Sequence, residues 1–290
     1  MKENVIALLI LLPSILLVGY FVYASIGWNV VVSLSNWKGL EPSYSIIGFN
    51  RYAELFYDPV FWISLKNNIL LILLFVPSSI LLGLFLSILL DMKVRGEGIF
   101  RTIYLLPFAL SFVITASLWA WMYDPKVGVI NILLDKVGLG LLKSGWVTDS
   151  SIAMYCVILA LTWQFSGYTM LIFLAGIRSI PESQVMAAEV DGAYGFNLYR
   201  RIIIPQLKSS ALAAFVILMV FALKGFDFIY VLTGGGPGGW STFVLPLEMF
   251  RETFTMTHFA YGAAIATVLF VIVMVVVVPY LYLSFRRREE

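Results

Sequence analysis

Six apolar runs, each close to the length of a membrane-crossing helix, dominate the sequence. A helix needs about 20 apolar residues to span a hydrocarbon layer of about 30 Å. Only 12% of the residues are charged, whereas an ordinary soluble domain has about 25%. We therefore predict an all-α, polytopic cell-membrane protein with six transmembrane helices. The runs lie near residues 5–23, 69–90, 102–122, 152–177, 211–232 and 259–285.

The Lys and Arg residues between these runs predict the orientation, because basic residues near the ends of spans stay in the cytoplasm. The first run exceeds the 7–15 residues of a signal-peptide core, so we expect it to be retained. Seven basic residues fall on one side: Lys38, Arg51, Lys66, Lys126, Lys136, Lys143 and Arg251. Eleven fall on the other, in shorter segments that include both ends of the chain, which predicts cytoplasmic termini: Lys2, Lys93, Arg95, Arg101, Arg178, Arg200, Arg201, Lys208, Arg286, Arg287 and Arg288.

The residues that catalysis requires are scarce. His258 is the only histidine and Cys156 the only cysteine, so the sequence predicts neither a metal cluster nor a disulfide. Gly140 and Gly145 have the glycine spacing of a phosphate-binding loop, but Trp146 stands where that loop needs lysine. A net charge of +2 does not indicate nucleic-acid binding. We predict that the chain is not an enzyme and holds no cofactor.

The connection between the fourth and fifth runs is too patterned for a simple linker. Pro181 suits the first turn of a helix, and Glu182 suits the positive end of the helix dipole. We expect this helix to stop near Asp191 and Gly192, where glycine permits a reversal and the aspartate can cap the following helix. Pro205 is expected to end that second helix. The pattern predicts a helix-turn-helix within residues 178–208.

The first of these helices carries small or adaptable side chains, including Met186, Ala187 and Ala188, with Ala193 beyond the turn. Such a surface suits insertion into a groove of another protein. The alternative is an amphipathic helix pair that lies on the bilayer.

Together, Ile180-Pro181, Ala187-Ala188-x-x-Asp191-Gly192-Ala193 and Ile202-x-x-Pro205 resemble the "EAA" signature of ABC importer permeases. In that family the segment is a coupling helix that docks into a cytoplasmic ATPase subunit. Met186 stands at the family's glutamate position, which alters that contact, and Tyr199 provides the usual aromatic. The resemblance implies an ATPase-coupling loop made by Met186, Ala187, Ala188, Asp191, Gly192 and Ala193.

Further segments resemble the sugar branch of these permeases, specifically the maltose-type or glycerol-phosphate-type first permease subunit. They are residues 47–52, 58–62, 100–107, 119–131 and 226–237. The resemblance implies the ABC transmembrane type-1 fold. It divides the chain into a first transmembrane helix with its exterior loop (1–62), a permease domain (63–285) and a cytoplasmic tail (286–290).

The same resemblance implies import of a sugar or oligosaccharide by alternating access. The partners would be a second homologous permease, ATPase subunits that bind ATP and Mg²⁺, and an extracytoplasmic solute-binding protein. Two alternatives are a glycerol 3-phosphate-type permease and an ion-coupled secondary transporter.

Two groups of residues are candidates for the solute path. Lys224 and Asp227 lie three residues apart in the fifth run, with Tyr230 continuing their helix face and Phe226 beside them. A charge at the centre of a membrane helix costs about 2.5–3.5 kcal/mol, so we expect these groups to face a cavity or each other. The alternative is a structural ion pair.

The second group lies in the fourth run, where the resemblance places solute contacts. Gln164 and Tyr168 share a helix face, and Trp163 and Phe165 are their neighbours. Sugars pack their C–H faces on aromatic rings and bond their hydroxyls to amides and phenols. The alternative for these side chains is helix packing.

Overall fold

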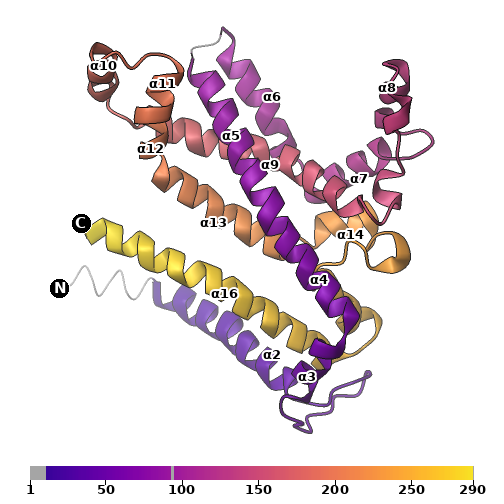
Figure 1. Cartoon of the computed structure of the whole chain (residues 1–290). Helices are drawn as coiled ribbons and strands as arrows, with labels where there is room; N and C mark the ends of the chain where they lie inside the picture. The colour runs from indigo at the N-terminus through magenta and orange to yellow at the C-terminus, as the bar shows by residue number, and fades with distance from the viewer. Residues whose placement is uncertain (1–10, 93–94, 290) are drawn as a thin grey trace, which may run out of the picture. The chain divides into compact units, whose positions relative to one another are not determined.

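The computed structural model describes residues 11–92 and 95–289, without the side chains of residue 276 and residues 280–289. In this described part, helices are joined by turns and loops, and one isolated antiparallel bridge links Ser35 to Ile46 (Figure 1). Lys2 and Lys93 lie outside the described residues, as do the side chains of Arg286, Arg287 and Arg288. The orientation of the termini therefore stays a prediction.

The chain forms two compact units. Unit 1 joins residues up to Trp62 with Leu245–Met274, and unit 2 contains Ile63–Val244 with the residues after Met274. The predicted division of the chain at residues 62 and 63 coincides with one unit boundary, but unit 1 also takes in a late segment. The predicted domain functions are not tested by this division.

Unit 1 is built around the first and last long helices. Asn29 Nδ2 on the first donates to Ala263 O at 3.1 Å and to Thr267 Oγ1 at 3.0 Å on the last, a polar tie between two apolar surfaces. Tyr261 Oη also donates to Asp58 Oδ2 at 2.7 Å. The helices are η1 (Gly19–Ala24), α2 (Ser25–Ser33), α3 (Asn50–Tyr57), the start of α4 (Pro59–Leu70), α15 (Leu245–Phe250), η7 (Arg251–Thr255) and most of α16 (Phe259–Glu289).

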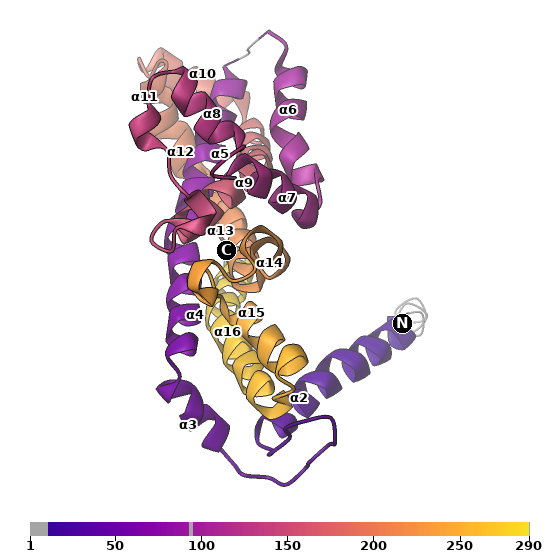
Figure 2. The same cartoon turned by 90° about the vertical axis from the view of Figure 1, so that its right-hand side faces the viewer.

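Unit 2 contains the remaining helices. Its centre is the pairing of α5 with α9, which lie side by side in Figures 1 and 2. The helices are η2 (Leu71–Phe75), α5 (Val76–Asp91), α6 (Glu97–Ala109), α7 (Phe112–Met122), α8 (Val129–Lys136), η3 (Gly140–Leu142), η4 (Trp146–Thr148), α9 (Ala153–Arg178), α10 (Glu182–Val190), α11 (Phe196–Leu198), η5 (Tyr199–Ile203), α12 (Ile204–Gln206), α13 (Lys208–Lys224), α14 (Asp227–Thr233) and η6 (Pro237–Gly239).

Glycines allow α9 its close packing. A Cβ on Gly167 would lie 1.8 Å from the Tyr104 carbonyl oxygen of α6, and one on Gly83 of α5 would lie 2.2 Å from Thr169 Oγ1 of α9. Small residues at such crossings let membrane helices approach closely. Because lipid is as apolar as the helix surfaces, van der Waals packing rather than the hydrophobic effect holds such helices together. Helices α5, α6 and α9 are therefore closely packed at the centre of unit 2.

Within residues 11–92 and 95–289, four helices are long and apolar enough to cross a membrane, and up to six spans result if each of two bent helix pairs counts as one. The four are Leu11–Ser33, Pro59–Asp91, Ala153–Arg178 and Phe259–Pro279. The prediction of an all-α polytopic membrane protein is confirmed. Two of the predicted spans, however, are not continuous helices.

The span predicted at 102–122 is broken in its middle. Helix α6 ends at Ala109, Leu110 is extended, and α7 begins at Phe112, with a bend of 97° between the two helices (Figure 2). Pro107 cannot donate a backbone hydrogen bond near this end. Ser111 caps the new helix, because its Oγ accepts from Ile114 N at 3.3 Å.

The span predicted at 211–232 is likewise interrupted. Helix α13 ends at Lys224, Gly225 leaves the helical conformation, and α14 starts at Asp227. Phe226 N donates to Lys224 O at 2.7 Å, which closes a three-residue turn. A second bend of 66° separates Phe196–Gln206 from α13. Irregular backbone at membrane depth is tolerated only where protein surrounds it or where it lines a cavity.

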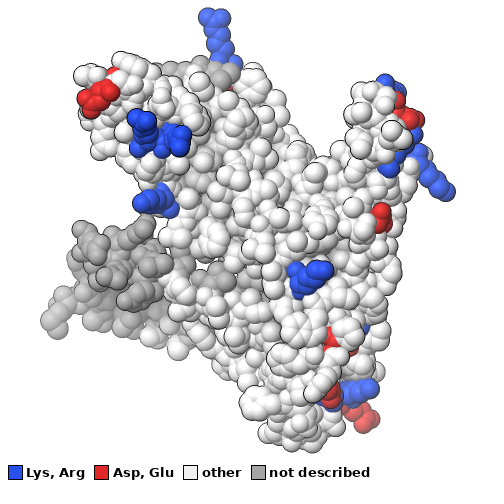
Figure 3. Space-filling model, in the orientation of Figure 1, with Lys and Arg blue, Asp and Glu red and all other residues white. Residues whose placement is uncertain are grey.

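Charged side chains of unit 2 gather at the end that carries α10 and α11 and around α8, with a mainly uncharged surface between them in the view of Figure 3. Large apolar side chains of the helix Pro59–Asp91 are exposed, including Leu73, Leu81 and Phe85. An apolar exposed belt between charged ends is what a bilayer requires.

Candidate translocation cavities and coupling segment

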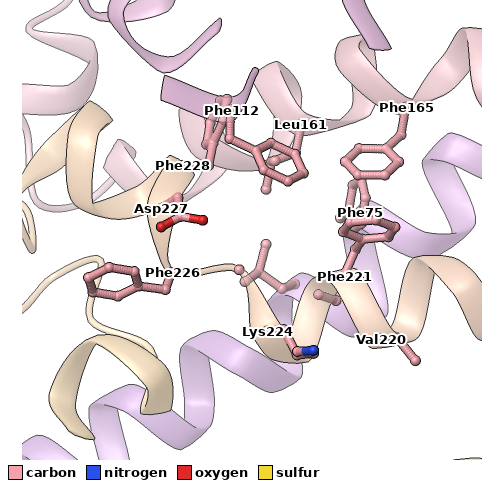
Figure 4. A pocket seen from close by; sticks show the side chains of 13 residues that line it. Phe75, Phe112, Leu161, Phe165, Val220, Phe221, Lys224, Phe226, Asp227 and Phe228 are labelled. Atoms are coloured by element: carbon pink, nitrogen blue, oxygen red, sulfur yellow. The ribbon is translucent and has the colours of Figure 1, made fainter. Parts of the chain in front are cut away.

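The helix breaks border two neighbouring cavities in unit 2. Cavity A, of about 280 Å³, contains the Gly225 break in its wall. Phe75 and Phe165 border one side of it, while Phe226 and Asp227 border the other (Figure 4). The broken backbone thus meets the condition for irregular structure at membrane depth. The complete lining is Leu71, Phe75, Phe112, Leu161, Phe165, Val220, Phe221, Ala222, Lys224, Gly225, Phe226, Asp227 and Phe228.

Cavity B, of about 370 Å³, lies at the break between α6 and α7. It shares Phe112, Phe221 and Asp227 with cavity A, so Asp227 borders both spaces. The complete lining of cavity B is Phe108, Leu110, Ser111, Phe112, Val113, Gln164, Phe221 and Asp227.

Gln164 joins the helix break to cavity B. Its Nε2 donates to Leu110 O at 3.4 Å, a carbonyl that the break removes from the helix ladder. The side chain is only 1% exposed, and its Oε1 has no hydrogen-bond partner among the described residues. A buried, unpaired acceptor costs about 1–3 kcal/mol, so it marks a position where a ligand donor would be favourable.

Lys224 and Asp227 do not form the pair that a continuous helix predicts. Gly225 separates their helices, and no ion pair between the two side chains occurs in the described part of the chain. Figure 4 shows Lys224 at the end of α13 and Asp227 at the start of α14. The expectation that the two residues share a helix face was wrong, because a turn at Gly225 interrupts the helix between them. Both residues nevertheless line cavity A.

The other candidate path residues have different surroundings. Phe165 is buried against Phe75 and Phe221, with ring centroids 5.3 and 4.8 Å away, so it forms the cavity wall. Tyr168 is half-buried and stacks on Phe108 at 4.6 Å. Tyr230 stacks on Phe226 at 5.3 Å. Neither tyrosine lines cavity A or B; each stacks instead on a phenylalanine that does, Phe108 of cavity B or Phe226 of cavity A.

Sequence reasoning missed Phe112 and Phe221, which border both cavities. In a chain with 16% aromatic residues they carry no distinctive signal. The breaks themselves had a signal, since Pro107 followed by the capping Ser111 and the single Gly225 interrupt otherwise apolar runs. Continuous hydropathy concealed these interruptions.

Residues 178–208, here called the coupling segment, contain the expected helix and reversal. Helix α10 begins at Glu182 directly after Pro181 and ends at Val190, as the sequence predicts. Gly192 has φ +84°, and Ala193 N donates to Ala188 O at 2.9 Å. A left-handed residue with this bond is a Schellman helix end, which glycine forms without a side-chain clash.

Two local expectations for the coupling segment were wrong. Asp191 does not cap the following helix, whose N-cap is Gly195 without a side-chain bond, because three further residues separate Asp191 from that position. Pro205 does not end the second helix, which runs to Gln206. The helix thus ends one residue after the proline and not at it.

The coupling segment has an inner and an outer face. Ala188 is buried with Leu198, Tyr199 and Ile203, in a cluster that also contains Phe173 and Ile177 of α9. The outer side presents large apolar groups: Met186 is 54% exposed and Val190 87%, and Ala187, Tyr194 and Phe196 are also exposed. Apolar side chains exposed together on a short helix-turn-helix indicate a contact surface.

Comparison with known proteins identifies the family. A family model described as the binding-protein-dependent transport system inner membrane component matches residues 79–290. This chain belongs to that family. It is 63% identical over 98% of its length to a probable ABC transporter permease protein of Pyrococcus horikoshii, of which it covers 97%. It is 43% identical over 92% of its length to a xylose/arabinose import permease protein of Haloferax volcanii, of which it covers 84%.

A solved structure has the same fold. A bacterial alginate ABC transporter, in complex with an alginate pentasaccharide-bound periplasmic protein, matches with a TM-score of 0.82 and 25% identity. The match covers 98% of this chain and 96% of that one. This permease therefore has the ABC transmembrane type-1 fold and is a multi-pass inner-membrane subunit of a binding-protein-dependent importer, not itself an enzyme. The alternative of an ion-coupled secondary transporter is not supported.

Proposed function

We propose that this permease imports a neutral sugar or oligosaccharide, and that cavities A and B are its part of the solute path. The observation that carries the proposal is the meeting of two broken helices at these cavities, where aromatic rings stand beside Asp227 and the unpaired Oε1 of Gln164. Rings suit the C–H faces of a sugar, and the two acceptors suit its hydroxyls. The name of the xylose/arabinose relative supports a neutral sugar, and the alginate transporter, which imports an acidic polysaccharide, supports only the broader carbohydrate class.

The charge of the cavity linings favours a neutral solute over glycerol 3-phosphate. Lys224 and Asp227 are the charged residues in the two linings, and their charges cancel. A phosphate needs an excess of positive donors, typically as an arginine fork or several amides. The glycerol 3-phosphate alternative therefore has less support than a sugar.

The energy source in this proposal is a set of separate ATPase subunits that bind ATP and Mg²⁺ and dock on the outer face of the coupling segment. The termini and this segment are cytoplasmic, a second homologous permease completes the path, and a solute-binding protein delivers sugar from outside. ATPase closure moves the coupling segment and exchanges inward-open and outward-open states. Met186 and Val190 give this docking surface an apolar character.

Purification of the chain from its native membrane in mild detergent tests this proposal. We expect an ATPase and a second permease to accompany it, and ATP hydrolysis to rise when a sugar-loaded binding protein is added. Candidate pentoses, oligosaccharides and glycerol 3-phosphate are compared in the same assay. Recovery of the chain without an ATPase would overturn the coupling proposal, and stimulation by glycerol 3-phosphate alone would overturn the sugar assignment.

A further inference from the structure

The coupling segment is tied to neighbouring helices near both of its ends. Near one end, Tyr199 Oη donates to Asp91 Oδ2 at 2.8 Å. At the other, Arg178 Nη2 donates to Glu97 Oε1 at 2.7 Å. Asp91 is the last residue of α5 and Glu97 the first residue of α6. Each tie therefore connects the segment to the end of a helix that is distant in sequence.

Tyr199 is more buried than either partner of the Arg178–Glu97 pair. Its side chain is 9% exposed, and its ring packs in the apolar cluster with Phe173, Ile177 and Ile203. The hydroxyl is therefore held in place by its ring. Asp91 has no other side-chain partner in the part of the chain that the structure describes. A phenol donating to a carboxylate is a charge-assisted bond, stronger than a neutral one.

Two connections lead from the coupling segment to the wall of cavity A, one through α9 and one through the Tyr199–Asp91 bond. The segment continues directly from α9, which supplies Leu161 and Phe165 to that wall. Asp91 ends the unbroken helix Pro59–Asp91, which supplies Leu71 and Phe75. From Phe75 to Asp91 this helix rises by about 24 Å at 1.5 Å per residue. One hydrogen bond and one helix therefore connect Tyr199 to Phe75.

We infer that Tyr199 is a positioning residue that couples the segment to α5 through Asp91, so that ATPase movement reaches both sides of cavity A. The inference rests on the proposed docking of an ATPase on the coupling segment. The Arg178–Glu97 pair, whose side chains are 46% and 27% exposed, contributes less, because partly exposed ion pairs hold geometry weakly. Without the Tyr199 bond, the segment keeps its apolar contacts with α5, and α5 stays bonded to α9, where Thr169 Oγ1 donates to Ser79 O at 2.9 Å. The Tyr199 bond adds a direct polar link from the segment itself to the end of α5.

The test uses the complete importer in proteoliposomes with sugar-loaded binding protein, and measures sugar uptake and ATP hydrolysis together. Tyr199→Phe keeps the ring in its cluster and removes only the hydroxyl. We expect the ATPase to remain bound and hydrolysis to stay within twofold of wild type, while sugar transported per ATP falls at least threefold. Tyr155→Phe is the matched control, since Tyr155 is an exposed tyrosine at the start of α9, outside the coupling segment and the cavity linings.

Changes at Asp91 separate coupling from folding. Asp91→Asn keeps an oxygen acceptor and should retain most of the sugar transported per ATP, whereas Asp91→Ala should match Tyr199→Phe. The double variant Asp91→Ala with Tyr199→Phe should be no worse than either single change. An unchanged transport ratio in Tyr199→Phe, or an equal loss of uptake and hydrolysis together with lower thermal stability, would overturn the inference. Absence of the ATPase from the wild-type complex would instead overturn the proposed function.

Discussion

At the scale of single residues, two positions, Gly192 and Gln164, allow direct tests of function. Gly192 allows the coupling segment to reverse after α10, because its backbone has φ +84° and no neighbouring atom would contact a Cβ there. The constraint is therefore conformational rather than steric. Gln164 bridges a broken helix and leaves one acceptor at cavity B. Each position makes a prediction that a stability measurement and a transport measurement can separate.

Substitutions at Gly192 should reduce transport in the order of their cost in the left-handed region. Asn tolerates this conformation, Ala pays about 1–2 kcal/mol, and a β-branched Val pays more. We expect Gly192→Asn to retain uptake and Gly192→Val to abolish it, with normal membrane insertion of both. Uptake assays and quantification of the chain in membranes check this. Full uptake by Gly192→Val would contradict a role for the reversal in coupling.

Replacing Gln164 by Leu should raise the apparent KM for the sugar about tenfold, because a hydrogen bond worth about 1.4 kcal/mol is lost. Thermal stability in detergent should change little, because the variant removes an unpaired buried acceptor but also takes away the donor to Leu110 O. Uptake at graded sugar concentrations and a thermal unfolding curve give the two values. A stability loss with unchanged KM would make Gln164 a packing residue.

At the scale of elements, the close approach of α9 to its neighbours holds the cavity walls. The Gly167 crossing brings α9 onto the backbone of α6, and the Gly83 crossing brings α5 onto α9. Phe75, Phe165 and Phe112 can then meet around one space although they come from three separate helices. The broken elements α6–α7 and α13–α14 supply the remaining walls, and α7 packs on α14.

Gly167→Ala should destabilise the permease by about 1–3 kcal/mol, because the added methyl overlaps a backbone carbonyl that cannot move aside alone. Gly27→Ala is the matched control: it lies in a helix with open space around it and should be neutral. Thermal unfolding of both variants in one detergent compares them. Equal unfolding midpoints would contradict the close packing of α9.

At the scale of the whole molecule, the apolar belt places the α10–α11 end and the α8 region of unit 2 at opposite sides of the bilayer in our proposal. The basic residues around the coupling segment, including Arg178, Arg200 and Arg201, predict that this end lies in the cytoplasm. The orientation can be tested without any transport assay, because the native chain has a single, buried cysteine.

In a Cys156→Ala background, a membrane-impermeant maleimide should label Leu141→Cys in intact cells, since Leu141 is fully exposed near α8. Met186→Cys should be labelled only in inside-out vesicles washed free of peripheral proteins. The wild-type chain, whose single cysteine Cys156 is buried, is the negative control. Labelling of Met186→Cys from outside would reverse the orientation and separate the coupling segment from any cytoplasmic ATPase.

The sequence alone determined the properties that depend on local composition. Apolar runs near the length of a bilayer define membrane helices, because the hydrocarbon core leaves a chain few alternatives. The coupling helix and its reversal followed from Pro181 and Gly192, since proline and glycine act through their own backbone. The signature residues around them led to the ABC-permease family, which the family match confirms.

Only the tertiary structure decided where the spans break and what the breaks face. Hydropathy averages over a window, so one Gly225 or one Leu110–Ser111 junction does not interrupt the signal. The position of Phe112 and Phe221 at both cavities and the Tyr199–Asp91 bond depend on the packing of helices that are distant in sequence. Such contacts depend on three-dimensional approach, which no local pattern of residues specifies.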